Sequence, residues 1–401
     1  MSERAESALE LLTKIPALPP EEDAAVWVTS KEALEKLAEE MASAPWIAVD
    51  TESNSMFCYR ERVCLIQLNV GGSIRLVDPI ALSEAPLPGH PSRALDALKA
   101  ALENPAQVKF VHGAEYDVAA LFRDFEIALF PIFDSHQAAE MLGWEKTGYG
   151  ALVERILGVK LPKDQAQYNW GTRPIDEKAV AYAEDEVRYL PGVCLAMGEA
   201  IRKAGLEEEL TLALHAVEAM RWHGGFQPEN FWKISEVRHL SEPQKRRLFA
   251  LFCLRDELAM AANMPAGRMI NERALLAMAK NPPKTLDDLK AAGIRSATIA
   301  LRGERILSAV HHPERVPGGY SFPKRPTSEP PDREQKEREA RLREWRQKES
   351  ERRSVSLTAV LPTPALKWLK AHGADDLKAV PQLGDKRIGL YGKTLQKLCQ
   401  I

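Results

Sequence analysis

The chain has 401 residues, of which 45% are hydrophobic and 28% charged, and its formal net charge at pH 7 is -3. This length predicts two or three domains, and the hydrophobic content is sufficient for buried cores. The charge balance excludes a uniformly basic surface, so contacts with nucleic acid would have to come from local Lys and Arg clusters or from bound metal ions. The five cysteines form no CxxC pair, no signal-peptide core begins the sequence, and no apolar stretch reaches the roughly 20 residues of a membrane span, so we expect a cytoplasmic protein.

The first half of the chain alternates between strand-like and helix-like patterns. Strand-like runs occur at WVTS, WIAVD, VCLIQLNV, SIRLVD and KFVH, and helical patterns occur at residues 31–41, 95–102, 134–157 and 176–204. Gly71 and Gly72, between the third and fourth of these runs, predict a hairpin turn. Together the patterns predict a mixed sheet with flanking helices, and a loop rich in polar, aromatic and basic groups before the last helix.

Acidic side chains occur at three separate places in this region. Asp50 and Glu52 end the run WIAV, Asp117 lies in HGAEYD, and Glu186 stands four residues after Tyr182. Because alternate side chains of a strand share one face, Asp50 and Glu52 would point into one pocket, where their repulsion favours a neutralising cation. Hard oxygen ligands favour Mg²⁺ or Mn²⁺. Each piece alone fits a cap, turn or helix-face residue. Their combination predicts a divalent-metal nuclease centre.

Other chemistries have less support in the sequence. His311 and His312 lack the spacing of a zinc site. Neither a Ser-His-Asp order nor a glycine-rich phosphate loop stands out, so we expect no organic cofactor.

The second half of the chain is mainly helical in pattern. Leucines recur at helical spacing after residue 242, at Leu248, Leu251, Leu254 and Leu258. A Pro- and Gly-rich stretch follows, and then REQKEREARLREWRQKESERR, whose mixed charges favour a solvated helix over an arm that orders on RNA. The predicted divisions are an N-terminal extension (1–24), an α/β domain (25–206), a helical connector (207–241), a helical domain (242–312), a charged Pro-rich linker (313–356) and a partial second helical module (357–401).

Near the end of the chain, VPQLGDKRIGLYG contains a turn with two adjacent cations. Backbone amides together with Lys386 or Arg387 would suit contact with a phosphate group at this turn. The sequence therefore predicts a nucleic-acid contact in the last module.

Several segments together resemble a known family. VDTES, RERVCLIQL, VHGAEYDVAALFRDF, FDSHQAAEMLGW, NWGTRPI and YAEDEVRYL resemble, in order and at suitable spacings, the motifs of the DEDD exonuclease superfamily, tyrosine subclass, and within it the ribonuclease D family. This resemblance covers roughly Val26 to Leu206. RDELA, NERALLAMA and PKTLDDL resemble the HRDC domain from about Glu242 to Val310, and the last module resembles the later part of a second one. The implied fold is α/β: a ribonuclease H-like mixed-sheet exonuclease domain followed by small all-α HRDC-type domains.

The resemblance also implies an activity and a role for each acid. It implies 3′-5′ removal of single nucleotides from RNA, such as tRNA precursors, by two divalent cations about 3.5 to 4 Å apart. By similarity, Asp50 would bridge both ions, and Glu52 and Glu186 would complete one ion site. Asp117 would support the other ion through water. Tyr182 would orient the attacking water or help to deprotonate it, and its usual pKa near 10 makes orientation the favoured role unless the metal ions lower that pKa. We expect the enzyme to be a monomer.

The sequence departs from the family pattern after Tyr182. The family has an aspartate four residues after this tyrosine, whereas here Glu186 occupies that position and Asp185 lies one residue earlier. At about 100° per residue either carboxylate can reach the site, and the register of VRYL favours Glu186, with Asp185 as its substitute. The additional methylene of glutamate predicts a slower or Mn²⁺-preferring enzyme.

The loop before the last helix departs from the pattern as well. Tyr168 and Asn169 precede Trp170, where ribonuclease D commonly has a serine and an aspartate. Lys163 and Arg173 are candidate phosphate contacts, and Tyr168 or Trp170 is a candidate for stacking on a terminal base. The equally weighted alternative is that Trp170 packs on the core and Arg173 pairs with a local acid.

Three functions stay open at this point. A 3′-5′ exoribonuclease is favoured by all the motifs together. A noncatalytic RNA-binding or scaffold protein on the same fold is favoured only by the change at Glu186. A 3′-5′ DNA exonuclease is the other alternative, because metal chemistry on the phosphate does not read the 2′-hydroxyl.

Overall fold

The computed structural model describes residues 6–16, 18, 24–82, 90–162, 167–325 and 332–400. The chain divides into two compact units. The first unit consists of Met1–Ser53, Arg62–Trp222 and Glu329–Ile401, and the second of Asn54–Glu61 and His223–Ser328. Within the described ranges, every helix is too short or too polar to serve as a membrane span.

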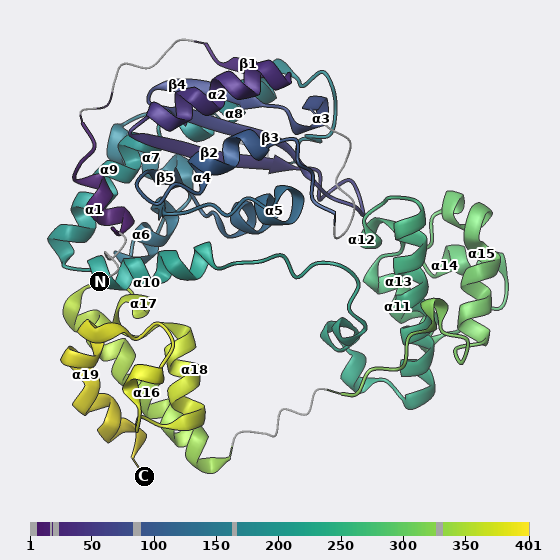
Figure 1. Ribbon diagram of the computed structural model, residues 1–401. Helices are drawn as coiled ribbons and strands as arrows, with labels where there is room; N and C mark the ends of the chain where they lie inside the picture. The colour runs from purple at the N-terminus through teal and green to yellow at the C-terminus, as the bar shows by residue number, and fades with distance from the viewer. Residues whose placement is uncertain are drawn as a thin grey trace. The chain divides into compact units, whose positions relative to one another are not determined.

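The first unit is built on one mixed sheet (Figure 1). Its strand order is β1-β4-β3-β2-β5-β6. Its strands are β1 (Val26–Val28), β2 (Trp46–Ser53), β3 (Val63–Val70), β4 (Ser73–Val77), β5 (Val108–Val111) and β6 (Ile132–Asp134). β3 is antiparallel to β2 and β4, and the other pairs are parallel. All eight residues of β3 are buried because helices cover both faces of the sheet. The mixed sheet with flanking helices confirms the predicted α/β fold. The short β6 was not predicted, since three residues carry no readable period.

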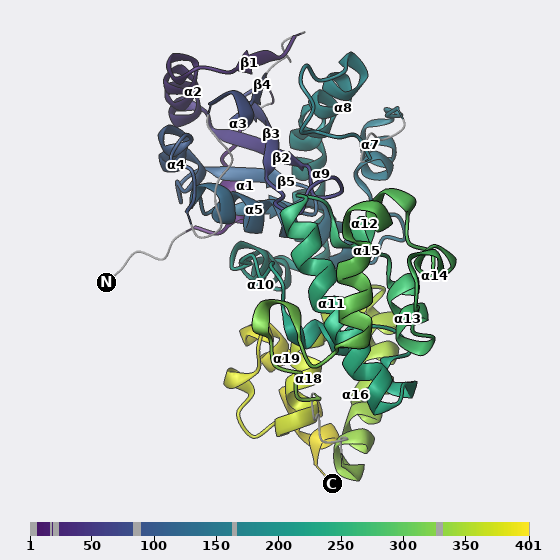
Figure 2. The ribbon, with the colours of Figure 1, turned by 90° about the vertical axis from the view of Figure 1, so that its right-hand side faces the viewer.

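Helices pack on both faces of this sheet. Figure 2 shows α2 (Lys31–Ser43) and α4 (Asp96–Leu102) on one side and α7 (Tyr149–Leu157) and α8 (Glu177–Arg188) on the other. The other helices of this domain are α1 (Ala8–Leu12), α3 (Pro79–Leu82), α5 (Glu115–Phe125), α6 (Ser135–Met141), α9 (Leu190–Ala204) and α10 (Glu207–Glu218).

Two long helical predictions are each divided in the structure. The stretch predicted at 134–157 contains α6 and α7, which are separated near Gly143, whose φ is +73°. The stretch predicted at 176–204 contains α8 and α9, with Pro191 in the first turn of α9. A left-handed glycine and a proline both interrupt the backbone hydrogen bonds of a helix without changing its apolar period.

The second unit is a helical domain that also includes the short segment Asn54–Glu61. Its elements are the 3₁₀ turns η1 (Pro228–Lys233), η2 (Val237–His239) and η3 (Pro317–Gly319), and the helices α11 (Glu242–Ala261), α12 (Ala266–Met269), α13 (Glu272–Lys280), α14 (Leu286–Ala291) and α15 (Ser296–His311). The predicted leucines at 248, 251, 254 and 258 are all buried in its core. Tyr59 packs on this core, and its hydroxyl donates to Asp256 Oδ1 at 2.7 Å.

The C-terminal module begins earlier than predicted. It consists of α16 (Arg333–Arg353), α17 (Leu357–Val360), α18 (Thr363–His372), the 3₁₀ turn η4 (Leu377–Ala379) and α19 (Gly384–Cys399). The linker predicted at 313–356 therefore includes a helix of this module. α16 buries Leu342 together with Arg338 and Arg346, whose guanidinium groups donate to the carbonyls of Lys370 and Leu357, each at 2.9 Å. A charge pattern cannot reveal such contacts, because it treats every arginine as solvated.

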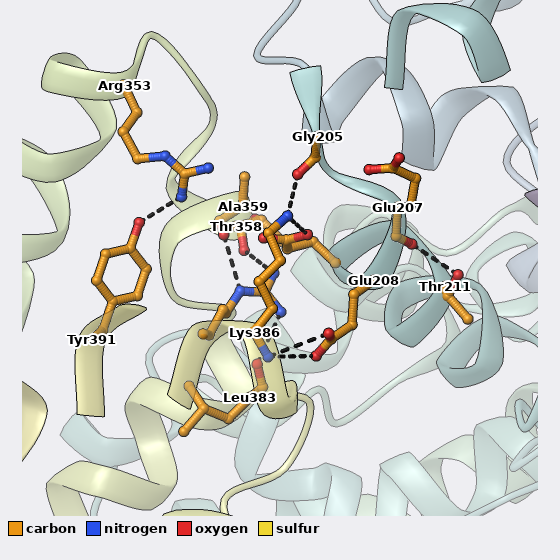
Figure 3. Close-up of polar contacts among 12 residues, drawn as sticks. Gly205, Glu207, Glu208, Thr211, Arg353, Thr358, Ala359, Leu383, Lys386 and Tyr391 are labelled. Atoms are coloured by element: carbon orange, nitrogen blue, oxygen red, sulfur yellow. Dashed lines mark hydrogen bonds and ion pairs between the residues drawn. The ribbon is translucent and has the colours of Figure 1, made fainter. Parts of the chain in front are cut away.

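This module packs against α10 of the α/β domain (Figure 3). Lys386 Nζ lies 2.8 Å from Glu209 Oε2 and also donates to the carbonyl of Gly205. The backbone N–H of Lys386 donates to the carboxylate of Glu208, at 3.0 Å from Oε1. Arg387 is 2% exposed and donates to four backbone carbonyls. The predicted phosphate contact by Lys386 or Arg387 is therefore wrong, because both cations already bind groups within the protein.

Candidate active site

β2 carries the first two predicted acids from the core to the surface. Residues 46–49 are buried, whereas Asp50 and Glu52 are partly exposed. In the antiparallel pairing with β3, Asp50 lies opposite Gln67, and Glu52 lies opposite Leu65. Alternation along the strand therefore places both carboxylates on one face of the sheet, the face that α8 covers.

Asp117 is held beside the same strand from a different element. It lies in the first turn of α5 and is 8% exposed. The hydroxyl of Thr51, the residue between the two acids of β2, donates to Asp117 Oδ1. Burial raises the pKa of Asp117 to about 6, although the Thr51 hydrogen bond opposes this shift. The hydrogen bond from Thr51 links α5 to the part of β2 that carries Asp50.

α8 supplies the tyrosine and the last acid. Ala179, Ala183 and Val187 are its buried residues, and the two small alanines let it pack closely on β3 and β4. Tyr182 and Glu186 are partly exposed, and the phenol donates a hydrogen bond to the Glu186 carboxylate. Burial and the charge of Glu186 raise the pKa of the phenol above its usual value, so Tyr182 keeps its proton at neutral pH.

The electrostatics of Asp50 show that these elements converge. Desolvation, followed by the charges of Asp117, Glu186 and Glu52, raises the pKa of Asp50 well above its usual range. Tyr182 is close to the same carboxylates, because the charges of Glu52 and Asp50 contribute to its raised pKa. The structure thus brings the five predicted residues, from β2, α5 and α8, into one electrostatic cluster.

Asp185, the predicted substitute for Glu186, faces another group. Its Oδ1 lies 3.6 Å from Nε of Arg188, one turn further along α8. Glu186, in contrast, is among the charges that act on Asp50 and Tyr182. The side chain of Glu186 therefore points to the cluster, whereas that of Asp185 is engaged beside it.

The donor set of this cluster suits divalent cations. Among the described residues, no three His, Cys, Asp or Glu side chains form a ready-made metal-ligand group, so the fit depends on the chemistry of the carboxylates. They are hard oxygen donors whose mutual repulsion a cation would offset. Gln67, opposite Asp50, is fully buried, and within the part of the chain that the structure describes neither polar atom of its amide has a hydrogen-bond partner. An orphaned amide beside Asp50 is consistent with a site that takes up further polar groups.

Two of the loop residues proposed to contact RNA, Trp170 and Arg173, instead contact groups within the protein. Trp170 is 1% exposed and packs with Cys64 and Leu65. Arg173 forms a two-pronged ion pair with Asp78, at 2.7 and 2.8 Å. The prediction that these two side chains contact RNA is therefore corrected: the indole offers almost no exposed face, and the guanidinium already binds a carboxylate.

The other two loop candidates have different outcomes. Tyr168 is partly buried, its ring centroid lies 5.1 Å from that of Trp170, and its hydroxyl accepts a hydrogen bond from the N–H of Asp176. Lys163 lies outside the described residues. A contact of either residue with RNA stays a prediction.

Sequence reasoning missed two side chains that contact α8 beside Glu186. Tyr149 of α7 and Asn69 of β3 donate to backbone carbonyls of this helix, at 2.9 and 3.3 Å. Tyr149 also lines a cavity of about 80 Å³ together with Tyr182 and Glu186. Only Pro191, which shows that a helix must break nearby, gives a sequence signal for such contacts.

Comparisons with known proteins show which families the chain resembles. Residues 25–202 match a family described as 3′-5′ exonuclease, and residues 244–310 match the HRDC domain. The chain is 29% identical over 304 residues to a ribonuclease D of Sphingobium indicum, an alignment that covers 72% of this chain and 76% of that protein. It is 26% identical over 295 residues to the ribonuclease D of Escherichia coli, covering 72% and 75%.

Solved structures show the same fold. The crystal structure of Escherichia coli RNase D, an exoribonuclease involved in structured RNA processing, matches with a TM-score of 0.68 at 23% identity, over 94% of this chain and 98% of that one. The catalytic core of RRP6 from Trypanosoma brucei matches with a TM-score of 0.68 at 22% identity, over 77% and 86%. The fold of this chain is therefore shared with these two solved structures.

Proposed function

Because residues 25–202 belong to the 3′-5′ exonuclease family and residues 244–310 form an HRDC domain, we propose that this chain is a metal-dependent 3′-5′ exoribonuclease of the ribonuclease D type. The observation that carries the proposal is the convergence of three other acids on Asp50, whose pKa is raised by burial and by their charges. Like charges gathered in this way are unfavourable for folding alone, and they are typical of a site completed by cations.

Each residue of the cluster has a role that follows from its position. Asp50, Glu52, Asp117 and Glu186 would hold two divalent cations, Mg²⁺ or Mn²⁺, which when bound supply the Lewis acidity for phosphodiester hydrolysis. Burial and the charge of Glu186 raise the pKa of Tyr182, which favours orientation of the attacking water by its hydroxyl.

The proposed substrate is the 3′ end of structured RNA, such as a tRNA precursor. The similarity to ribonucleases D over 72% of the chain and the HRDC domain support RNA as the substrate. A monomeric state and a cytoplasmic location stay predictions from the sequence.

The test uses 5′-labelled RNA and DNA of one sequence, incubated with the full chain in Mg²⁺, Mn²⁺ or a chelator. We expect stepwise shortening of RNA from its 3′ end with either metal, none with chelator, and none by the Asp50→Ala variant. Equal shortening of DNA would replace the proposal with a nuclease that does not read the sugar. Binding of RNA without shortening in either metal would favour a scaffold protein.

The substitution in the motif has its own test. Glu186→Asp restores the family residue, and we expect it to raise the rate in Mg²⁺ more than in Mn²⁺, because Mg²⁺ demands stricter octahedral geometry. Unchanged rates in both metals would remove the reason to expect a slower or Mn²⁺-preferring enzyme.

A further inference from the structure

The helix that carries Glu186 is interrupted directly after it. α8 ends at Arg188, Tyr189 forms a bend, and α9 follows with Pro191 in its first turn. Proline has no N–H, so it cannot donate to the carbonyl of Val187, four residues earlier. The carbonyl oxygens around Glu186 therefore need donors from outside the helix.

Tyr149 of α7 supplies one of these donors. Its hydroxyl donates to the carbonyl of Asp185 at 2.9 Å and accepts a hydrogen bond from the N–H of Tyr189. In an uninterrupted helix these two backbone groups, four residues apart, would bond to each other. The Tyr149 hydroxyl is thus inserted into the hydrogen-bond ladder of the helix, at its kink.

Asn69 of β3 supplies another donor. Its Nδ2 donates to the carbonyl of Val187 at 3.3 Å, and its Oδ1 accepts from the N–H of Gly72 at 2.9 Å. The side-chain amide replaces the N–H that Pro191 lacks. The carbonyls on both sides of Glu186 are therefore held by side chains of other elements.

Tyr149 is itself fixed in place. It is 7% exposed, and its ring centroid lies 5.5 Å from that of His112, whose Nδ1 is 2.9 Å from the Ser135 hydroxyl. Because the ring is packed in this way, its hydroxyl has a defined position relative to α8, and it lines the same cavity as Tyr182 and Glu186.

We propose that Tyr149 is a positioning residue for Glu186: its hydroxyl fixes the kink between α8 and α9 and so directs the Glu186 carboxylate toward Asp50. The inference rests on the proposed function. A glutamate has one more rotatable bond than the aspartate expected at this position, so its carboxylate depends more on a fixed backbone. Tyr149 acts on Glu186 through the backbone carbonyl of Asp185.

The first test is Tyr149→Phe, which removes one oxygen atom and keeps the ring. We expect kcat to fall about tenfold with KM for RNA within about twofold, as a misplaced catalytic group predicts. In the same full chain without RNA, binding of Mn²⁺ alone should weaken about tenfold. Tyr391→Phe is the matched control, since it removes a hydroxyl that bonds to Arg353 in the C-terminal module, and it should leave both quantities unchanged.

The second test asks whether Tyr149 acts through Glu186. In a Glu186→Gln background, Tyr149→Phe should weaken Mn²⁺ binding no further, because the group that it positions has lost its charge. Amide hydrogen exchange at residues 185–189 should become faster in Tyr149→Phe, which reports on the kink without any metal.

The outcomes separate two failures. A wild-type chain that neither shortens RNA nor binds Mn²⁺ would overturn the proposed function together with this inference. A wild-type chain that does both, with Tyr149→Phe equal to it in kcat, Mn²⁺ affinity and exchange, would overturn only the role of Tyr149. A further loss of Mn²⁺ affinity in the Glu186→Gln background would do the same.

Discussion

The acid cluster and the C-terminal module both bury charge, but in opposite ways. In the module, the buried guanidinium groups of Arg338, Arg346 and Arg387 donate to backbone carbonyls. Around Asp50, burial and then the charges of three neighbouring carboxylates raise its pKa. Buried charge that is surrounded by partners serves the fold, whereas buried like charge lowers stability and marks a site that a ligand completes. Burial alone does not separate the two cases; the sign and number of the partners do.

The largest expected effect comes from removing one charge of the acid cluster. Asp50→Asn keeps the shape of the side chain, and we expect it to reduce RNA shortening at least about a thousand-fold, equivalent to about 4 kcal/mol in the activation barrier. In chelator, the same variant should unfold at a higher urea concentration than the wild type, because repulsion within the cluster is relieved. Glu145→Gln, at an exposed position, should change neither quantity. If Asp50→Asn were less stable than the wild type in chelator, Asp50 would belong with the partnered charges.

The second effect comes from removing a partnered charge. Arg387→Met should lower the free energy of unfolding by about 3 kcal/mol, because buried carbonyls lose their charged donor. Lys393→Met, an exposed position on the same helix, should stay within about 0.5 kcal/mol of the wild type. Urea denaturation measures both variants. If Arg387→Met instead bound RNA more weakly and kept the stability of the wild type, Arg387 would be a phosphate contact after all.

The part of the acid cluster that the sequence could predict depends on local geometry. Strand alternation places Asp50 and Glu52 on one face whatever the rest of the fold does, and helix spacing relates Tyr182 to Glu186 in the same way. The ordered motifs then supplied the topology that brings β2, α5 and α8 together. The mixed α/β fold followed from the same local periods.

The partnered charges could not be predicted in this way. Whether Arg387 faces RNA, water or a carbonyl depends on segments distant in sequence, and the same holds for Arg173 with Asp78. Tyr149 was missed because it bonds to a backbone carbonyl. Every residue has this group, so no residue type in the sequence marks the contact. A local pattern shows which charges are present, and only the tertiary structure shows which of them already have partners.

The contact between the C-terminal module and α10 should give a smaller effect. Lys386→Met leaves Glu209, which is 1% exposed, without its partner at 2.8 Å, and we expect a loss of about 2 kcal/mol in the free energy of unfolding. Adding Glu209→Gln should recover about half of this loss, since no unpaired charge then stays buried. A double-mutant cycle in urea measures the coupling. Additive losses would mean that the two side chains do not depend on each other.

The smallest expected effect concerns Lys109 of β5, a buried side chain within the mixed sheet. It is fully buried, and its Nζ donates to the carbonyls of Asn104 and Phe130, each at 2.7 Å. Burial lowers its pKa to about 7, although Glu218 and Glu103 oppose this shift. Above pH 7 the unfolded chain therefore binds a proton that the folded chain has lost, so stability rises with pH up to the unfolded pKa.

We expect the free energy of unfolding to rise by about 1 kcal/mol between pH 7 and 8 in the wild type, and not in Lys109→Met. Urea denaturation at the two pH values measures the difference, and comparison with the variant removes the contribution of other groups that titrate in this range. Arg387→Met should keep the wild-type rise, because a guanidinium holds its proton at both pH values. Equal pH dependence of the wild type and Lys109→Met would show that two carbonyls are enough to keep a buried lysine charged, and Lys109 would then join the arginines of the C-terminal module as a partnered charge.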